Sequence, residues 1–133
     1  MLKPLPLKEK KMVVLNLVLY AQYFDLIKSG RKKEEYRDIT SYYANKLMAG
    51  GYFETKEDLE DFVSKLKKPS ERDKVMKEKG AYFRYGNNLP NDYTHIRFYR
   101  GHTGMTMLVE VKGIEIQDKY FVIKLGKIVD GKD

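Results

Sequence analysis

Residues 23–38, YFDLIKSGRKKEEYRD, join a short amphipathic helix to a dense run of charge. The apolar members of the helix recur at the spacing that places them on one face: Tyr23, Phe24, Leu26 and Ile27. Gly30 can adopt the positive φ that ends such a helix. The next five residues, RKKEE, are all charged and are therefore too polar for a core strand. We expect a helix over 21–29 and then a charged strand over 32–39 at the edge of a sheet.

The segment before this helix, residues 12–19, reads MVVLNLVL and would be buried on both faces if extended. This pattern is typical of a strand in the centre of a sheet. Together with the basic residues before it, the apolar run superficially resembles a signal peptide, but Asn16 interrupts it. We favour a cytoplasmic protein in which residues 1–11 are a poorly ordered lead. No apolar run approaches the ~20 residues of a membrane span, so we expect no membrane partner.

The composition indicates one domain with an excess of positive charge. The chain has 133 residues, of which 42% are hydrophobic, so it can form one core but is too short for two. It contains no cysteine, which excludes disulfides and thiolate chemistry. The formal net charge of +7 favours an anionic partner such as nucleic acid or a nucleotide. A lysine-rich surface that only maintains solubility would give the same net charge.

The middle of the chain, residues 41–91, is predicted to be mainly helical and strongly charged. Thr55 and Asp58 form a capping box at the start of one helix. Its apolar stripe consists of Leu59, Phe62, Val63 and Leu66. A second helix beginning at Pro69 has barely one turn of apolar residues and should pack weakly. We interpret residues 41–91 as a charged helical elaboration of the domain.

The last forty residues are predicted to form strands. Ile96 and Phe98 alternate with polar residues, which is the period of a half-buried strand. The alternation shifts at Gly113, as a β-bulge would cause, and Gly126 is placed to bend the final strand. With the two strands nearer the N-terminus, this makes about five strands. The prediction is an α+β fold in which a small curved β-barrel is flanked by helices.

Two basic and aromatic groups are candidates for a binding site. The first contains Lys32, Lys33, Glu35, Tyr36 and Arg37, and the second contains Arg97, Tyr99 and Arg100. Arginine binds phosphate through paired hydrogen bonds and tyrosine stacks on bases, so the two groups together could form a nucleotide cleft. On a strand, Lys33, Glu35 and Arg37 share one face, while Lys32 lies at the turn before it. An ordinary surface salt bridge at Glu35 is the alternative explanation.

Standard catalytic motifs are missing from the sequence. It contains no glycine-rich phosphate loop, no HExxH and no GxSxG. Its two histidines, His95 and His102, could meet across a hairpin, but a catalytic zinc ion needs three protein ligands. We therefore expect surface histidines, no metal site and no cofactor.

The spacing Gly30-x-Lys32-x-x-Glu35-x-Arg37, after an apolar strand and the helix YFDLIKSG, resembles the ASCH domain, a family of the PUA-like barrels. The resemblance extends to IRFYRG at 96–101, EVKGIEI at 110–116 and YFVIKLGKIV at 120–129. Residues 41–91 match less well. The resemblance implies a cleft between barrel and helix, lined by residues 30–37 and suited to RNA or a modified nucleoside.

The resemblance also bears on activity. Family members are regarded mainly as RNA-binding modules, but some small bacterial relatives deacylate N4-acylcytidines with a lysine in this motif, a threonine three residues later and a separate glutamate. Lys32 matches the lysine, whereas Glu35 occupies the threonine position, so the hydroxyl nucleophile is missing. Other members have been proposed to cut RNA. If the protein is an enzyme, Glu35 would be a general base and Lys32 would stabilise an oxyanion.

The sequence therefore predicts a single ASCH-type domain over residues 12–130 that binds RNA or a nucleotide. The expected phosphate contacts are Lys32, Lys33 and Arg37, the expected stacking residue is Tyr36 or Tyr99, and Arg97 and Arg100 would extend the basic track. Glu35 would orient a base edge or a lysine. Two alternatives stay open. One is an amidohydrolase for a modified nucleoside or a ribonuclease, and the other is a protein-interaction module that uses the charged helices at 55–79.

Overall fold

The computed structural model describes residues 11–131 of the chain. Its elements are β1 (Val14–Leu19), α1 (Ala21–Lys28), β2 (Glu34–Asp38), α2 (Ser41–Leu47), β3 (Met48–Gly50), α3 (Lys56–Leu66), α4 (Pro69–Lys79), β4 (Ala81–Phe83), β5 (His95–Arg100), β6 (Thr106–Gln117) and β7 (Tyr120–Asp130). The predicted α+β class is confirmed. The predicted lead at 1–11 lies outside the described residues, except for its last position.

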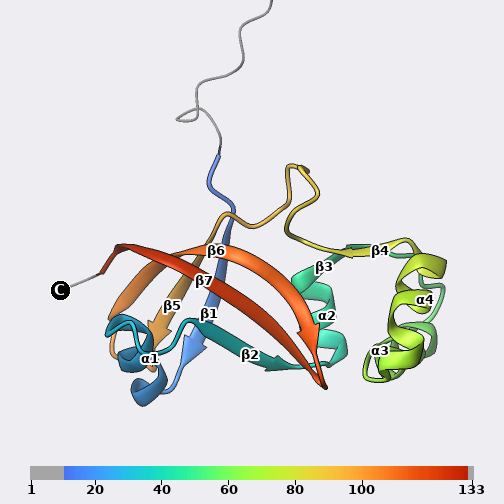
Figure 1. Ribbon diagram of the computed structural model, residues 1–133, viewed down its shortest axis with the longest axis horizontal. Helices are drawn as coiled ribbons and strands as arrows, with labels where there is room; N and C mark the ends of the chain where they lie inside the picture. The colour runs from blue at the N-terminus through green and yellow to red at the C-terminus, as the bar shows by residue number, and fades with distance from the viewer. Residues whose placement is uncertain (1–10, 132–133) are drawn as a thin grey trace, which may run out of the picture.

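A curled five-stranded sheet forms the body of the molecule (Figure 1). The strand order is β1-β5-β6-β7-β2, in which β1 and β5 are parallel and the other neighbours are antiparallel. The sheet is a half-barrel, because β1 and β2 are its two edges and do not pair with each other. The curved sheet is as expected, but hydrogen bonding does not close it into a complete barrel.

β1 occupies an edge, and the prediction of a central strand buried on both faces is wrong. Leu15, Leu17 and Leu19 point into the core, whereas Val18 between them is 55% exposed. β1 hydrogen-bonds to β5 on one side alone, so the other edge is left open. The edge position of β2 is as expected. A further small sheet, formed by β3 and β4 with Met48 opposite Phe83, was not predicted.

The long ribbon of β6 and β7 contains the expected bulge. Its register shifts at three points between Leu108 and Gly113, after which Ile114 pairs with Ile123. At position 126 an added Cβ would lie 2.7 Å from Cε of Lys112, so glycine leaves room for that flexible side chain. The stem of Lys112 therefore lies across Gly126.

One hydrophobic core connects the sheet to all four helices. Its fully buried large side chains include Phe24, Leu47, Phe62, Phe98 and Phe121. α1 packs against β1 and β5, and α3 packs against α2 and α4. Consequently α1 and the α3–α4 pair lie at opposite ends of the molecule (Figure 1).

The α3–α4 pair, residues 56–79, forms as the sequence predicts. The Thr55 hydroxyl accepts a hydrogen bond from the Asp58 amide at 3.1 Å, and the Asp58 carboxylate accepts one from the Glu54 amide at 3.3 Å. In α4 the buried residue is Val75, in agreement with its short apolar face. Arg72 donates to the Leu66 carbonyl at 2.7 Å and to the Asp118 carbonyl at 2.6 Å, which connects α4 to the β6–β7 turn.

Candidate functional site

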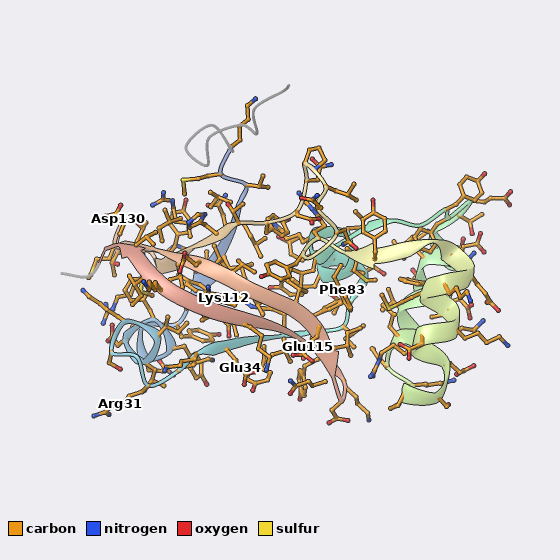
Figure 2. All side chains as sticks on the ribbon, turned by 45° about the horizontal axis from the view of Figure 1, so that its top comes forward. Arg31, Glu34, Phe83, Lys112, Glu115 and Asp130 are labelled. Atoms are coloured by element: carbon orange, nitrogen blue, oxygen red, sulfur yellow. The ribbon has the colours of Figure 1, made fainter. Side chains whose placement is uncertain are left out.

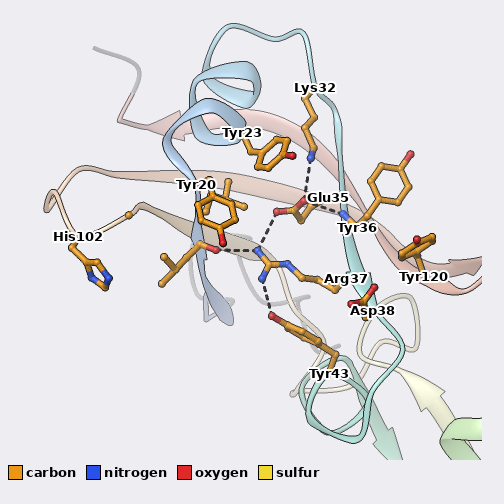
Figure 3. Close-up of a pocket in the computed structure, with 13 residues that line it drawn as sticks. Tyr20, Tyr23, Lys32, Glu35, Tyr36, Arg37, Asp38, Tyr43, His102 and Tyr120 are labelled. Atoms are coloured by element: carbon orange, nitrogen blue, oxygen red, sulfur yellow. Dashed lines mark hydrogen bonds and ion pairs between the residues drawn. The ribbon is translucent and has the colours of Figure 1, made fainter.

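A pocket of about 750 Å³ opens between the two edge strands, β1 and β2 (Figure 3). Five of the eleven tyrosines of the chain line it: Tyr20, Tyr23, Tyr36, Tyr43 and Tyr120. Its charged and ionisable members are Lys32, Glu35, Arg37, Asp38 and His102. We call this site the tyrosine pocket. It lies where the half-barrel is open, so a ligand can enter without separating paired strands.

Glu35 forms the floor of the tyrosine pocket. It is 4% exposed and is the one buried charged residue among residues 11–131. In the β2–β7 ladder it lies opposite Ile123, a core residue, and side chains of directly opposed residues share a face. Tyr36, the next residue, therefore points to the other face and is 45% exposed.

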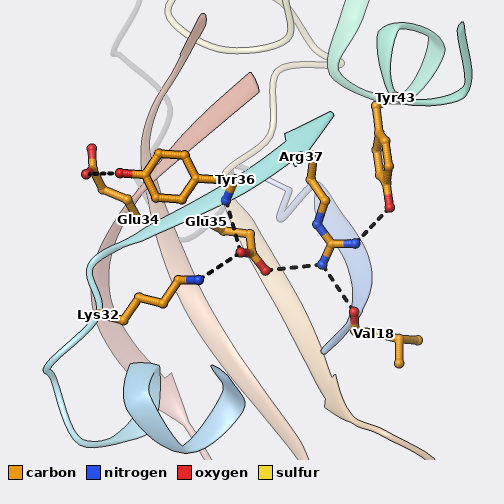
Figure 4. Close-up of polar contacts among 7 residues, drawn as sticks. All are labelled: Val18, Lys32, Glu34, Glu35, Tyr36, Arg37 and Tyr43. Atoms are coloured by element: carbon orange, nitrogen blue, oxygen red, sulfur yellow. Dashed lines mark hydrogen bonds and ion pairs between the residues drawn. The ribbon is translucent and has the colours of Figure 1, made fainter. Parts of the chain in front are cut away.

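Two cations and an amide neutralise the buried carboxylate (Figure 4). Glu35 Oε1 accepts hydrogen bonds from Lys32 Nζ at 3.2 Å and from the Tyr36 amide at 3.0 Å. Its Oε2 accepts from Arg37 Nη2 at 3.1 Å. A buried carboxylate is tolerated only when it is paired and hydrogen-bonded, so these three side chains are stable as a set. The set carries a net charge of +1 at the bottom of the pocket.

Arg37 connects the two edges of the sheet. From β2, its Nη2 donates to the Val18 carbonyl of β1 at 3.1 Å, and its Nη1 donates to the Tyr43 hydroxyl of α2 at 2.7 Å. Tyr43 is itself held in the first turn of α2, where its amide donates to the Thr40 hydroxyl at 3.2 Å. Arg37 thus fixes the separation of the walls, and most of its donors are already used.

Lys32 lies over the pocket because of how α1 ends. Gly30 has a φ of +82°, and the amide of Lys32 donates back to the Leu26 carbonyl at 3.1 Å. This turn places Lys32 Nζ 4.7 Å from the centre of the Tyr23 ring and 5.9 Å from the centre of the Tyr36 ring. An ammonium has three donors, and Glu35 accepts one of them, so Lys32 can donate to a ligand as well.

The outer wall of the pocket is aromatic, and a hydrogen bond to a charged neighbour shifts the pKa of Tyr36. The rings of Tyr36 and Tyr120 meet edge to face with centres 6.4 Å apart. The Tyr36 hydroxyl donates to Glu34 at 2.9 Å, and this bond raises the Tyr36 pKa. Glu34 also pairs with Lys124, and this pairing lowers the Glu34 pKa. Lys124 has a second acidic partner, Glu115, which lies on the same part of the sheet as Glu34 (Figure 2).

The structure brings together only part of the predicted site. Lys32, Glu35, Tyr36 and Arg37 line the tyrosine pocket. Lys33 does not; it precedes β2, so it does not share a strand face with Glu35 and Arg37, and it lines a neighbouring groove instead. Tyr36, one of the two expected stacking residues, lies at the rim of the pocket and not in the core.

The second predicted group lies elsewhere. Arg97 and Tyr99 alternate with buried residues of β5 and lie on the face opposite the core, where the Tyr99 hydroxyl contacts Asn16 at 3.4 Å. Arg100 Nε and Nη2 donate to the Asp25 carboxylate of α1, at 3.0 and 3.1 Å, and this pairing lowers the Asp25 pKa. None of the three lines the tyrosine pocket.

The sequence reasoning missed much of the aromatic lining. Tyr23 was assigned to the buried face of α1, but it is 42% exposed and its ring faces Lys32. His102 was expected to be a surface histidine; it lies in the turn after β5 and also lines the far margin of the pocket (Figure 3). His95 begins β5 and His102 follows its end, so the two histidines are roughly 20 Å apart and do not meet. Tyr20, Tyr43 and Tyr120 join through tertiary structure.

Comparison of the chain with protein-family models, with curated proteins and with solved structures finds no match in any of the three. The resemblance to the ASCH family therefore stays a prediction. In the part of the chain that the structure describes, no group of three or more histidine, aspartate or glutamate residues is placed to hold a metal ion. No helix within 11–131 is long and apolar enough to span a membrane.

The chemistry of the pocket suits binding more than bond cleavage. Three donors already occupy the Glu35 carboxylate, which leaves little room for it to accept a proton from water. The tyrosine rings and the partly exposed ammonium of Lys32 face the opening, where they can meet a flat ring and an anionic or carbonyl oxygen.

Proposed function

We propose that this protein is an ASCH-type module that binds a nucleotide, or one nucleotide of a single-stranded RNA, in the tyrosine pocket. One observation carries the proposal: five tyrosines surround the hydrogen-bonded set of Lys32, Glu35 and Arg37 at the open edge of the half-barrel. Stacking of a base on an aromatic side chain contributes about 1–3 kcal/mol and tolerates any base. A volume of about 750 Å³ lies within the range of small-ligand sites.

The two walls have distinct roles in this proposal. Tyr36 and Tyr120 stand on the β2–β7 side, and Tyr20 and Tyr23 stand on the β1–α1 side, so a base can enter between them. Lys32 then donates to a phosphate or to a base carbonyl. Arg37 acts as a positioning residue, because it holds the walls apart rather than offering a free fork.

The two alternatives are weaker on the same geometry. A hydrolase needs a base that can accept a proton, and Glu35 is already hydrogen-bonded to three donors. A protein-interaction surface on the helices needs exposed apolar anchors, whereas the buried residues of α3 and α4 face the core.

Tyrosine fluorescence provides a direct test, because the chain has eleven tyrosines and no tryptophan. The four nucleoside monophosphates, N4-acetylcytidine and short single-stranded RNAs would be titrated into the full chain at two salt concentrations. We expect saturable quenching that weakens with salt, with no product in the same tubes.

Two variants and a control locate the site. Tyr23→Ala and Tyr36→Ala should each weaken mononucleotide binding by about tenfold, which corresponds to the loss of one stacking contact. Tyr52→Ala is the control, since Tyr52 is 71% exposed and does not line the pocket. Equal affinities for all three variants would refute the proposal. Turnover that disappears in Lys32→Gln would make the protein an enzyme instead.

A further inference from the structure

A second concave surface adjoins the tyrosine pocket and is lined by five lysines: Lys28, Lys32, Lys33, Lys112 and Lys127. Its volume is about 630 Å³, and its other lining residues are apolar or glycine: Ile27, Gly30, Leu125, Gly126 and Ile128. We call this surface the lysine groove. No carboxylate of residues 11–131 lines it, so within this part of the chain it concentrates positive charge over an apolar floor.

The lysine groove is assembled from distant parts of the chain. Lys28 ends α1, Lys33 precedes β2, and Lys112 and Lys127 come from β6 and β7. Figure 2 places Lys112 on β6, on the α1 side of Glu115. Glu110 is the nearby acid in the contacts of Lys127, and its carboxylate accepts from the Lys127 amide at 3.0 Å rather than from the ammonium.

The groove lysines differ from lysines elsewhere on this protein. Among residues 11–131, the side chains of Lys33, Lys112 and Lys127 have no ion pair. None of the three pairs with any of the acidic residues that lie within this described part of the chain. Lysines held close together without counter-charges repel one another, so an anion in the groove would relieve that repulsion.

The groove and the tyrosine pocket share one residue, Lys32, which lines both. A ligand held over Lys32 in the pocket can therefore continue into the groove. A base that enters the pocket must be unstacked, which favours a single-stranded nucleic acid over a duplex. The stem of Lys112 lies across Gly126, and both residues line the groove.

We propose that the lysine groove binds the sugar-phosphate chain of a single-stranded RNA whose base occupies the tyrosine pocket. This inference rests on the proposed function and extends it, because it assigns an oligonucleotide rather than a lone nucleotide as the ligand. Lys33, Lys112 and Lys127 contact phosphates beyond the one at Lys32. Affinity therefore grows with strand length until the groove is filled.

The test compares a mononucleotide with a single-stranded octanucleotide on three forms of the full chain. The first is the unchanged protein, and the second carries Lys33→Gln, Lys112→Gln and Lys127→Gln. The third is a charge-matched control with Lys56→Gln, Lys65→Gln and Lys74→Gln, which lie on the α3–α4 pair and face acidic partners. Thermal melting confirms that all three forms are folded.

We expect the groove variant to lose at least tenfold in affinity for the octanucleotide while its affinity for the mononucleotide stays the same. Its slope of log affinity against log salt should fall by about two, since each phosphate contact on a single strand contributes ~0.7. The control should lose less than threefold. A single-stranded DNA octamer reports whether the 2′-hydroxyl matters.

The outcomes separate this inference from the proposed function. If the mononucleotide binds but the octanucleotide binds no tighter, or if the groove variant matches the control, the groove inference is wrong and the proposed function stands. If the groove variant weakens octanucleotide binding but Tyr23→Ala and Tyr36→Ala do not, the proposed function is wrong. The inference that one RNA strand occupies both the pocket and the groove is then wrong as well. If inorganic polyphosphate competes as well as RNA of equal charge, the groove is a general polyanion site and the RNA assignment is overturned.

Discussion

The α3–α4 pair and the lysine groove use the same residue type in opposite ways. Residues 55–80 contain eight lysines and arginines and seven acidic residues. Four of these lysines pair with an acid at helical spacing: Lys56–Glu60, Lys65–Asp61, Lys68–Glu71 and Lys74–Glu78. The groove is lined by five lysines, and three of them, Lys33, Lys112 and Lys127, have no ion pair among the described residues. The helices thus present a nearly neutral surface, whereas the groove presents a surface on which positive charge is concentrated.

This difference shows that net charge alone does not locate a binding surface. Exposed ion pairs at helical spacing contribute only about 0.3–0.5 kcal/mol each, and their fields largely cancel. In the groove, tertiary structure brings together lysines from α1, β6, β7 and the loop before β2, and their fields add. Most of the net charge of +7 lies outside residues 55–80. Four changes test this contrast, beginning with the largest expected effect.

Arg37→Ala should be the most damaging change, because it removes one partner of a buried ion pair. Glu35 would keep Lys32 but lose the guanidinium, and the bond to Val18 across the open edge would disappear. We expect a loss of about 3 kcal/mol in the free energy of unfolding, measured by urea denaturation. Lys65→Ala, which breaks an exposed pair, should cost less than about 0.5 kcal/mol. Similar losses for the two variants would contradict the buried role of Glu35.

Lys33→Glu places an acid among the lysines of the groove, so that the groove mixes lysine and acidic residues as the α3–α4 pair does. Affinity for a single-stranded octanucleotide should fall by about tenfold, since one phosphate contact is lost and a repulsive charge is added. Asp61→Asn is the opposite change on α3, because it removes the acidic partner of Lys65. It raises the net charge by one but should alter affinity by less than twofold. Fluorescence titration at one salt concentration measures both, and a gain for Asp61→Asn would break the contrast.

Gly126→Ala should have a smaller effect that is confined to the groove. The new Cβ would lie 2.7 Å from Cε and 2.9 Å from Cγ of Lys112, so this flexible stem must move. We expect two- to threefold weaker octanucleotide binding and little change in melting temperature. Gly86→Ala is unsuitable as a control because its φ is +82°, so Ala49→Gly on β3 serves instead. An unchanged affinity would mean that Lys112 contacts no phosphate.

Arg100→Gln should leave RNA binding unchanged, because Arg100 is engaged by Asp25 and not by the pocket or the groove. Its hydrogen bond lowers the pKa of Asp25, so the pair stabilises the folded state above the ordinary carboxyl pKa, and this contribution is lost as pH falls through the lowered value. In Arg100→Gln the Asp25 pKa should rise toward its ordinary value, which carboxyl NMR measures directly. A drop in octanucleotide affinity would restore the predicted role of Arg100 in the basic track.

Local patterns in the sequence were sufficient for most elements of the fold. The helix and strand around Gly30, the Thr55 cap and the bulge near Gly113 were all predicted from spacing within one segment. The position of β1 was not, because its exposed Val18 is as apolar as its buried leucines. β3 and β4 have three residues each, too few to show a period.

The candidate site, like the fold, was predictable from the sequence only where its residues are close together in the chain. Lys32, Glu35 and Arg37 lie within six residues, so their contacts were visible as a local motif. Tyr20 and Tyr120 reach the pocket only through the curl of the sheet, and no spacing connects them. The Arg100–Asp25 pair spans seventy-five positions and withdraws an arginine that the sequence offered as a ligand contact. Tertiary structure thus determines which of the charged residues are available to contact a ligand.

The order of the strands also sets when the tyrosine pocket can exist. Its two walls, β1 and β2, lie early in the chain, yet each is held by a late strand: β1 by β5 and β2 by β7. β1 ends at Leu19, and its partner β5 begins only at His95, so β1 has no partner strand until synthesis has reached that residue. At ~5–20 residues per second that delay is roughly 4–15 s. A nascent chain therefore exposes the Lys32–Arg37 segment well before it can form the pocket, and the proposed affinity for RNA can arise only after β7 has been synthesised.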